Sequence, residues 1–247
     1  MDKYLYLAMS GAGQAMFAQQ NNANNLANVS TVGFKAALDS FQSSPVYGPG
    51  NPDRVYARNE SSGANLSGGA LMTTGRDLDI AINGDGWFAV QAPDGSTAYS
   101  RRGDFHIDPN GLMLNGANQI VQGESGPITL PQFESLVIGR DGTISMRAVG
   151  QAANSLVAVD RLKLVNPPMD QLYRGEDGLF RVSGGEELPA DASVSVTAGA
   201  LEASNVNAVD AMVRMMDYAR YYEHQVKLMK LASENDAASS RLMRMNG

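Results

Sequence analysis

Cysteine is absent from this 247-residue sequence, and histidine occurs only twice, at His106 and His224. The absence of cysteine excludes disulfide bonds, thiol nucleophiles and thiolate metal sites, but it says nothing about the compartment in which the protein works. Two isolated histidines without a local Ser-His-Asp signature give little support to a nucleophilic enzyme. We therefore expect no catalytic residue, no metal site and no cofactor.

Long apolar runs are also missing. No stretch approaches the ~18 consecutive apolar residues that read as a membrane helix. The N-terminal segment MDKYLYLAMSGAGQAMFAQQ has Asp2 beside Lys3, and Ser10, Gly11 and Gly13 interrupt its apolar run, so it makes a poor cleavable signal peptide. We expect no direct membrane insertion and, if the protein is exported, a route that does not read such a signal.

Basic charge is scarce, with 19 Lys and Arg against 26 Asp and Glu and a formal net charge of -7. Phosphate binding needs a concentrated basic surface, so a nucleic-acid partner is not expected. The acidic turn residues Asp85, Asp94, Asp108 and Asp141 are scattered singly. A calcium loop needs several oxygens from one short segment, which argues against a calcium site.

The first 32 residues carry a helical pattern. A heptad that starts at Leu5 gives the series Leu5, Ala8, Ala12, Ala15, Gln19, Asn22, Leu26 and Val29. Alanine at three successive core positions, Ala8, Ala12 and Ala15, allows close helix approach but buries little surface, so this helix needs partners.

Residues 203–247 return to a helical period, with Ser204 or Asn205 as the expected cap. One heptad series is Met212, Met215, Ala219, Tyr222, Val226 and Met229, and a second stripe is Val206, Val209, Val213 and Met216. The two terminal helices most simply pair with each other as a coiled coil. The remaining apolar face suggests docking against other subunits, as in a polymerising protein.

The middle of the chain has two parts. Residues 33–75 contain Pro45, Pro49 and Pro52 and are expected to form an extended connector, in which Tyr47, Val55 and Tyr56 could pair as short strands. Residues 76–202 alternate β-prone runs with Asn-Gly and Asp-Gly turns, which predicts an antiparallel sandwich or barrel-like domain. Its expected core anchors are Trp87, Phe88, Phe105 and Phe180. The predicted class is α+β, with a discontinuous helical coiled-coil domain and a central all-β domain.

The stretch NNLANVSTVGF, residues 24–34, ends the first helix with an unusual density of asparagine. Five asparagines fall within residues 21–28. Asparagine is a weak helix former, and in a helix seam it specifies register at a cost in stability. We expect these amides to bond to neighbouring backbones across subunits. Gly33 then permits a turn that bulkier residues disfavour, with Phe34 as an anchor after it.

Four segments resemble the family of flagellar rod, hook and hook-associated proteins: NNLANVSTVGFK (24–35), LSGGALMTTGRDLDIAINGDGWFAV (66–90), YSRRGDFHIDPNGLMLNGANQIVQG (99–123) and GALEASNVNAVDAMVRMM (199–216). The short connector, GPITLP, RLKLV and DGLFRV are most similar to the proximal-rod members. A distal-rod protein, which usually has a longer insertion after the first helix, is the alternative.

The resemblance implies a bacterial structural protein and no enzyme. It would be exported through the flagellar type III apparatus without a cleaved signal and would assemble in the periplasm as a helical tube that transmits torque. The terminal helices would line the tube, and the β domain would lie outside. Implied partners are proximal- and distal-rod subunits and the export apparatus, with the surrounding periplasmic ring as a further candidate.

We expect the subunit interface to draw on the signature residues and on the apolar face of the last helix. The expected interface residues are Asn21, Asn22, Asn24, Asn25, Leu26, Asn28, Gly33, Phe34, Asn205, Val206, Val209, Met212, Val213, Met216, Tyr222, Val226 and Met229. A competing hypothesis is a secreted β-domain binding protein or glycan hydrolase whose terminal helices form only a two-helix stem. A paired-carboxylate hydrolase is compatible with the many Asp and Glu residues.

Overall fold

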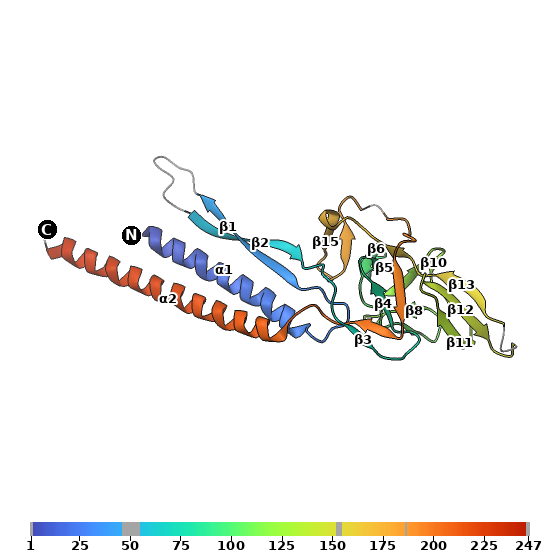
Figure 1. The fold of residues 1–247 in the computed structure, drawn as a ribbon. Coiled ribbons are helices and arrows are strands. Elements are labelled where there is room, and N and C mark those ends of the chain that lie inside the picture. The colour runs from blue at the N-terminus through green and yellow to red at the C-terminus, as the bar shows by residue number, and fades with distance from the viewer. Residues whose placement is uncertain (1, 46–54, 152–154, 186, 246–247) are drawn as a thin grey trace. The chain divides into compact units, whose positions relative to one another are not determined.

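The computed structural model describes residues 2–45, 55–151, 155–185 and 187–245, and the chain divides into two compact units (Figure 1). The helical unit comprises Met1–Val29, Ala37–Gly63 and Val206–Gly247, and the β unit comprises Ser30–Ala36 and Ala64–Asn205. Residues 33–75, expected to form one connector, are thus shared between the two units. The helices at both ends and the antiparallel strands between them agree with the α+β class.

Two long helices dominate the helical unit: α1 (Asp2–Ala27) and α2 (Ala208–Met245), which pack against each other. Asn207 caps α2, because its Oδ1 accepts hydrogen bonds from the backbone N–H groups of Val209 (3.0 Å) and Asp210 (3.4 Å). The predicted cap at residue 204 or 205 was therefore wrong. Over the described residues, neither helix combines the length and apolarity needed to cross a membrane.

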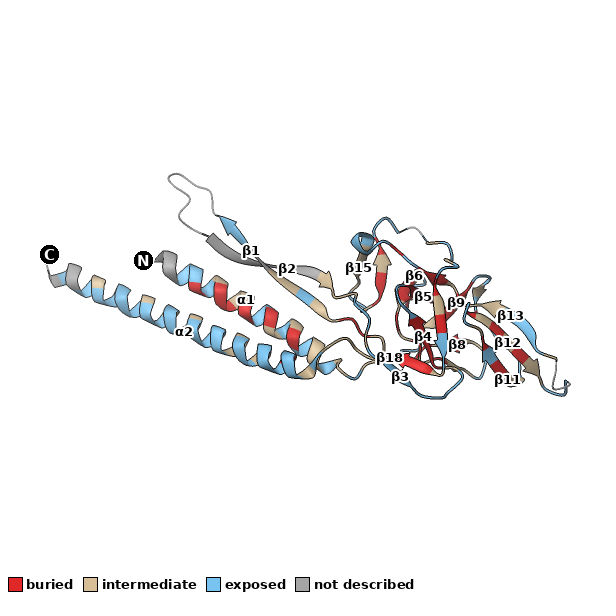
Figure 2. Cartoon of the chain, in the orientation of Figure 1, coloured by how far each residue is buried: buried red, intermediate tan, exposed pale blue. Residues whose placement is uncertain are grey.

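Figure 2 shows buried stretches along α1, and the buried apolar residues described in this helix are all alanines. Ala8, Ala12 and Ala15 of the predicted heptad are buried. The approach to α2 is close, because a Cβ added at Gly11 would lie 3.0 Å from Gln225 Cδ. The seam predicted for α1 is therefore buried at these positions.

The contacting side of α2 differs in part from the predicted heptad. Met215 is half-buried, as predicted. Ala211 and Gln225, however, lie against α1, while Met212 and Val226 are exposed. Met212 and Val226 were therefore each predicted one residue away from the side chain that lies against α1, and both face outward.

A pair of strands completes the helical unit: β1 (Ala37–Pro45) and β2 (Val55–Ala64), with β1 in contact with α1. Val55 and Tyr56, which were expected to form a short strand, lie in β2. Tyr47 lies outside the described residues.

The β unit is built from short strands joined by tight turns. The strands are β3 (Leu71–Thr73), β4 (Ile80–Asn83), β5 (Trp87–Gln91), β6 (Thr97–Ser100), β7 (His106–Ile107), β8 (Met113–Leu114), β9 (Ile120–Gly123), β10 (Gly126–Pro127), β11 (Phe133–Ile138), β12 (Thr143–Ala148), β13 (Val157–Arg161), β14 (Leu164–Val165), β15 (Leu172–Arg174), β16 (Phe180–Val182), β17 (Ser195–Ala198) and β18 (Ala200–Glu202), with a 3-10 turn at Met169–Gln171.

These strands form one large and three small antiparallel sheets. The large sheet runs β15-β16-β6-β5-β9-β8-β7, with β10 on β9 and β14 on β5. The others are β11-β12-β13, β4-β17 and β3-β18. The last two sheets join the start of the β unit to its end.

All four predicted core anchors are buried. The Trp87 and Phe180 rings lie 4.6 Å apart between centroids, and Phe88 meets Phe105 edge-on at 5.1 Å. Such tilted and edge-on aromatic pairs add to the free energy gained from burial.

Aspartates close several turns of the β unit by accepting hydrogen bonds from a residue two positions on. The Ser96 hydroxyl and N–H both donate to Asp94, and they hold the pKa of that carboxyl below its usual value. Thr143 and Ser193 lower the pKa of Asp141 and Asp191 in the same way. These turns therefore favour ionised aspartates.

We predict that acid destabilises the β unit through these turns. A carboxyl whose pKa is lower in the folded chain stabilises the fold above the usual aspartate pKa of about 3.9, and that contribution is lost as the pH falls through the lowered pKa. The urea concentration at the unfolding midpoint should be lower at pH 2.5 than at pH 5, with the ionic strength held constant. The combined variant Ser96→Ala, Thr143→Val and Ser193→Ala should show a shallower fall, and identical slopes would contradict the prediction.

Candidate assembly interface and the junction of the signature segments

The chain leaves α1 through a turn that only glycine fits well. Gly33 has φ +66°, and a Cβ there would lie 2.4 Å from the carbonyl carbon of Arg101. Its N–H donates to the carbonyl of Glu202 at 2.7 Å. The predicted role of Gly33 as a turn residue is confirmed, and the turn packs against two other signature segments.

A buried triad of charged residues follows: Lys35, Arg101 and Glu202, whose side chains are 0%, 3% and 3% exposed. Lys35 Nζ lies 2.6 Å from Glu202 Oε1, and Arg101 Nη1 lies 3.1 Å from Glu202 Oε2. The N–H of Gly69 also donates to Glu202 Oε1, at 2.8 Å. Burial lowers the pKa of the Lys35 amine, and the hydrogen bond to Glu202 opposes that shift. One carboxylate thus joins three separate segments.

Phe34 and Asn205 complete the junction. Phe34 is buried beneath the Arg174 guanidinium, which lies 4.6 Å from the ring centroid. Asn205 Oδ1 accepts from the N–H of Ala36 at 2.7 Å, and Asn205 Nδ2 donates to the carbonyl of Asn65 at 2.8 Å. Asn205 therefore links the residue before β1 to the residue after β2, and its side chain is not available to cap α2.

The asparagines at the end of α1 mostly bond within the chain. Asn22 is buried, and its Nδ2 donates to the carbonyl of Ala211 at 2.6 Å. Asn21 and Asn25 bond to β1, and Asn28 Nδ2 donates to the carbonyl of Asn24 at 2.9 Å. Leu26 and Asn28 are half-buried, while Asn24 is exposed.

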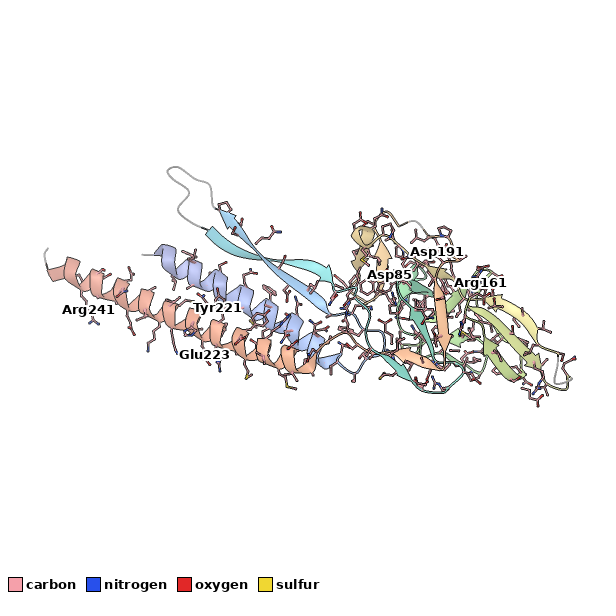
Figure 3. The ribbon with its side chains drawn as sticks, viewed as in Figure 1. Asp85, Arg161, Asp191, Tyr221, Glu223 and Arg241 are labelled. Carbon is pink, nitrogen blue, oxygen red and sulfur yellow. The ribbon has the colours of Figure 1, made fainter. Side chains whose placement is uncertain are left out.

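An apolar stripe on α2 faces solvent. It is formed by Val209, Met212, Val213 and Met216, at helical spacings of three, four and seven, and Val209 is 69% exposed. Tyr222 and Val226 extend the exposed apolar surface toward the C-terminus, and Val206 and Met229 are half-buried. Figure 3 draws the side chains that stand off α2, with Tyr221, Glu223 and Arg241 labelled.

A second apolar face lies on α1, away from the alanine line. Tyr6, Met9, Met16 and Phe17 are all exposed, and Met16 reaches 65%. This face was not predicted, because its residues lie outside the heptad of α1. Both helices therefore present large apolar side chains that remain exposed within the described part of the chain.

Two family models match the chain. Residues 81–146 match the model described as "Flagellar hook protein FlgE/F/G D1 domain", and residues 197–242 match "Flagellar basal body rod FlgEFG protein C-terminal". The first range lies in the β unit, and the second runs from β17 through most of α2.

Full-length relatives agree with the models. The chain is 40% identical to the flagellar basal-body rod protein FlgF of Escherichia coli and 38% identical to that of Salmonella typhimurium, over 100% of each chain. The chain belongs to the FlgF family of flagellar basal-body rod proteins. The family resemblance seen in its signature segments is confirmed. A rod protein named FlgG, from Buchnera aphidicola, is 29% identical over 93% of this chain.

In this FlgF family chain the four signature segments meet at the junction. Sequence reasoning assigned Gly33, Phe34 and Asn205 to the subunit interface, and the structure shows their partners within the same chain. The Lys35, Arg101 and Glu202 triad was missed, because its members are far apart in sequence. A usable signal was present: each is a charged residue inside a signature segment.

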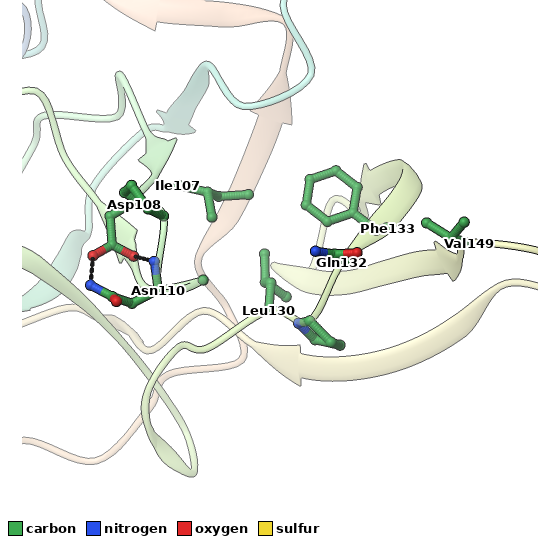
Figure 4. A pocket seen from close by; sticks show the side chains of 10 residues that line it. Ile107, Asp108, Asn110, Leu130, Gln132, Phe133 and Val149 are labelled. Atoms are coloured by element: carbon green, nitrogen blue, oxygen red, sulfur yellow. Dashed lines mark hydrogen bonds between the residues drawn. The ribbon is translucent and has the colours of Figure 1, made fainter.

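The competing hypothesis of a binding protein or hydrolase is not supported by the relatives, which are rod proteins. Among the described residues, no group of three or more His, Asp or Glu could hold a metal ion. An open hollow of about 490 Å³ lies beside the β7–β8 turn (Figure 4), and its one carboxylate, Asp108, is engaged by Asn110 N–H at 2.9 Å and Asn110 Nδ2 at 2.8 Å. The hollow therefore offers no paired carboxylates for hydrolysis.

Proposed function

We propose that this FlgF family protein is a structural, non-enzymatic subunit of the flagellar basal-body rod that assembles with other axial subunits through its terminal helices. The observation that carries the proposal is the exposed stripe of Val209, Met212, Val213 and Met216. Contiguous exposed apolar surface on a soluble protein marks an interaction site, and contacts between unlike surfaces generate helical assemblies.

The remaining expectations follow from the same proposal. The helices assemble as coiled-coil layers around the export channel of the proximal rod, and the subunits pass through the type III apparatus without a cleaved signal. The rod stands in the periplasm, transmits torque, and runs inside the surrounding ring. The division into helix 1–32, connector 33–75, β domain 76–202 and helix 203–247 is kept as a proposal about folding units.

The proposed interface centres on Val206, Val209, Met212, Val213, Met216, Tyr222, Val226 and Met229, together with Asn24, Leu26 and the α1 face. The exposed apolar side chains support this set, because a pair of helices needs only one apolar seam and these side chains lie outside it. Asn21, Asn22, Asn25, Asn28, Gly33, Phe34 and Asn205 contribute by fixing the subunit, because their contacts are within the chain.

The test replaces Val209 and Val213 by serine. Burying a valine side chain contributes about 1.5–3 kcal/mol, and the loss recurs in every subunit contact, so we expect lost rod assembly and lost swimming in soft agar. The purified variant should keep its urea midpoint, because both side chains are exposed in the single chain.

The matched control replaces Arg214 and Asp217 by serine. Both residues are exposed, directly follow the stripe residues Val213 and Met216 in sequence, and carry opposite charges, so the net charge is unchanged. This control should swim. Normal swimming by the valine variant, expressed at wild-type level, would overturn the proposed interface.

A further inference from the structure

The strand pair β1–β2 is attached to α1 by side-chain amides. Asn25 Oδ1 accepts from the N–H of Ala37 at 2.8 Å, and Asn25 Nδ2 donates to the carbonyl of Ala37 at 2.9 Å. Exchanging both bonds with one residue is what a paired strand residue does. Asn25 therefore acts as a one-residue strand partner at the first position of β1.

A second contact repeats one helical turn earlier. Asn21 Nδ2 donates to Asp39 Oδ1 at 2.5 Å. Four residues rise about 6 Å along a helix, and two residues span about 6.6 Å along a strand, so the two spacings match. The pairs 21–39 and 25–37 thus set α1 and β1 in opposite directions with a fixed register.

The intervening face of α1 binds the other helix. Asn22 is buried, and its amide donates to the carbonyl of Ala211 in the first turn of α2. Two other elements, β1 and α2, are therefore tied to one stretch of five residues of α1. Asparagine suits this role because its short side chain carries both a donor and an acceptor.

We propose that Asn21, Asn22 and Asn25 are positioning residues that brace β1–β2 and the start of α2 on α1, so that the strand pair moves with the helices as one arm. This brace explains why asparagine, which lowers helix stability, stands at these positions, because each amide makes a hydrogen bond that alanine could not make. The role of the arm in assembly rests on the proposed function, but the brace itself does not.

The test compares Asn25→Ala with Asn24→Ala by hydrogen exchange on the purified full-length chain. Asn24 is exposed, and its side-chain amide meets no partner among the residues that the structure describes, which makes it a matched control in the same turn. Loss of both Ala37 hydrogen bonds should speed exchange in residues 37–45 about tenfold, and the control should match wild type. Peptides from β11–β13 should be unchanged in both.

Unchanged exchange in residues 37–45 of Asn25→Ala, or an equal rise throughout the chain, would overturn the brace. If Asn25→Ala does not fold, a double-mutant cycle of Asn21→Ala and Asp39→Ala carries the test: coupled effects on the same peptides support the brace, and additive effects overturn it. Because exchange is measured without assembly, failure of the brace is distinguishable from failure of the rod assignment. If Asn25→Ala shows the faster exchange in residues 37–45 and still swims like wild type, the arm has no role in assembly.

Discussion

Replacing Glu202 by alanine is expected to lower the free energy of unfolding by about 3–5 kcal/mol, the usual cost of removing one partner from a buried ion pair. The substitution leaves Lys35 and Arg101 buried with like charges and no carboxylate between them. It also removes the acceptor for the N–H of Gly69. Urea unfolding followed by circular dichroism measures the loss, and a chain this destabilised should also fail to support motility.

Two further variants separate charge from packing. Glu202→Gln keeps the shape but not the charge, so it should lose most of the same stability. Glu124→Ala removes the carboxylate of an exposed pair, in which Glu124 lies 3.4 Å from Arg161, and should cost about 0–1 kcal/mol. If Glu202→Ala costs no more than Glu124→Ala, the junction does not depend on the triad.

The second large effect is expected at Gly69, where a Cβ would lie 1.9 Å from the carbonyl oxygen of Ala203. Overpacking of this kind costs about 1–3 kcal/mol, and the upper end applies because the neighbour is backbone and cannot rotate away. Gly69→Ala should therefore lower the thermal midpoint and loosen the pairing of β3 with β18.

The neighbouring glycine supplies the control for this prediction. A Cβ at Gly68 would meet nothing within 4 Å, so Gly68→Ala should change the unfolding free energy by no more than about 0.5 kcal/mol. Equal midpoints for the two alanine variants would show that β3 adjusts without cost, contrary to the close approach described above.

Local patterns predicted the elements better than their partners. Alanines at heptad spacing marked the buried side of α1, and Asn-Gly and Asp-Gly turns marked the β unit, because both signals lie within a few residues. The seam of α2 was partly wrong because several faces of that helix are apolar. Large side chains such as Met212 looked like core residues, while the small Ala211 made the contact.

Contacts between distant segments could not be read from the sequence. Nothing local links Lys35 to Arg101 or Glu202, so their pairing depends on the fold. The asparagines illustrate the same limit: bonds to neighbouring backbones were expected, and Asn22 and Asn25 make them, but to Ala211 and Ala37 of the same chain. Val209, Val213 and Met216 of the exposed stripe were predictable because they follow helical periodicity, whereas Met212 was expected in the seam.

Cryo-electron microscopy of isolated basal bodies tests the assembly claim most directly. With side chains resolved, we expect this chain in the rod, with Val209, Met212, Val213 and Met216 buried against neighbouring subunits. Absence of the chain from the rod, or a stripe that faces solvent within it, would contradict the proposed assembly.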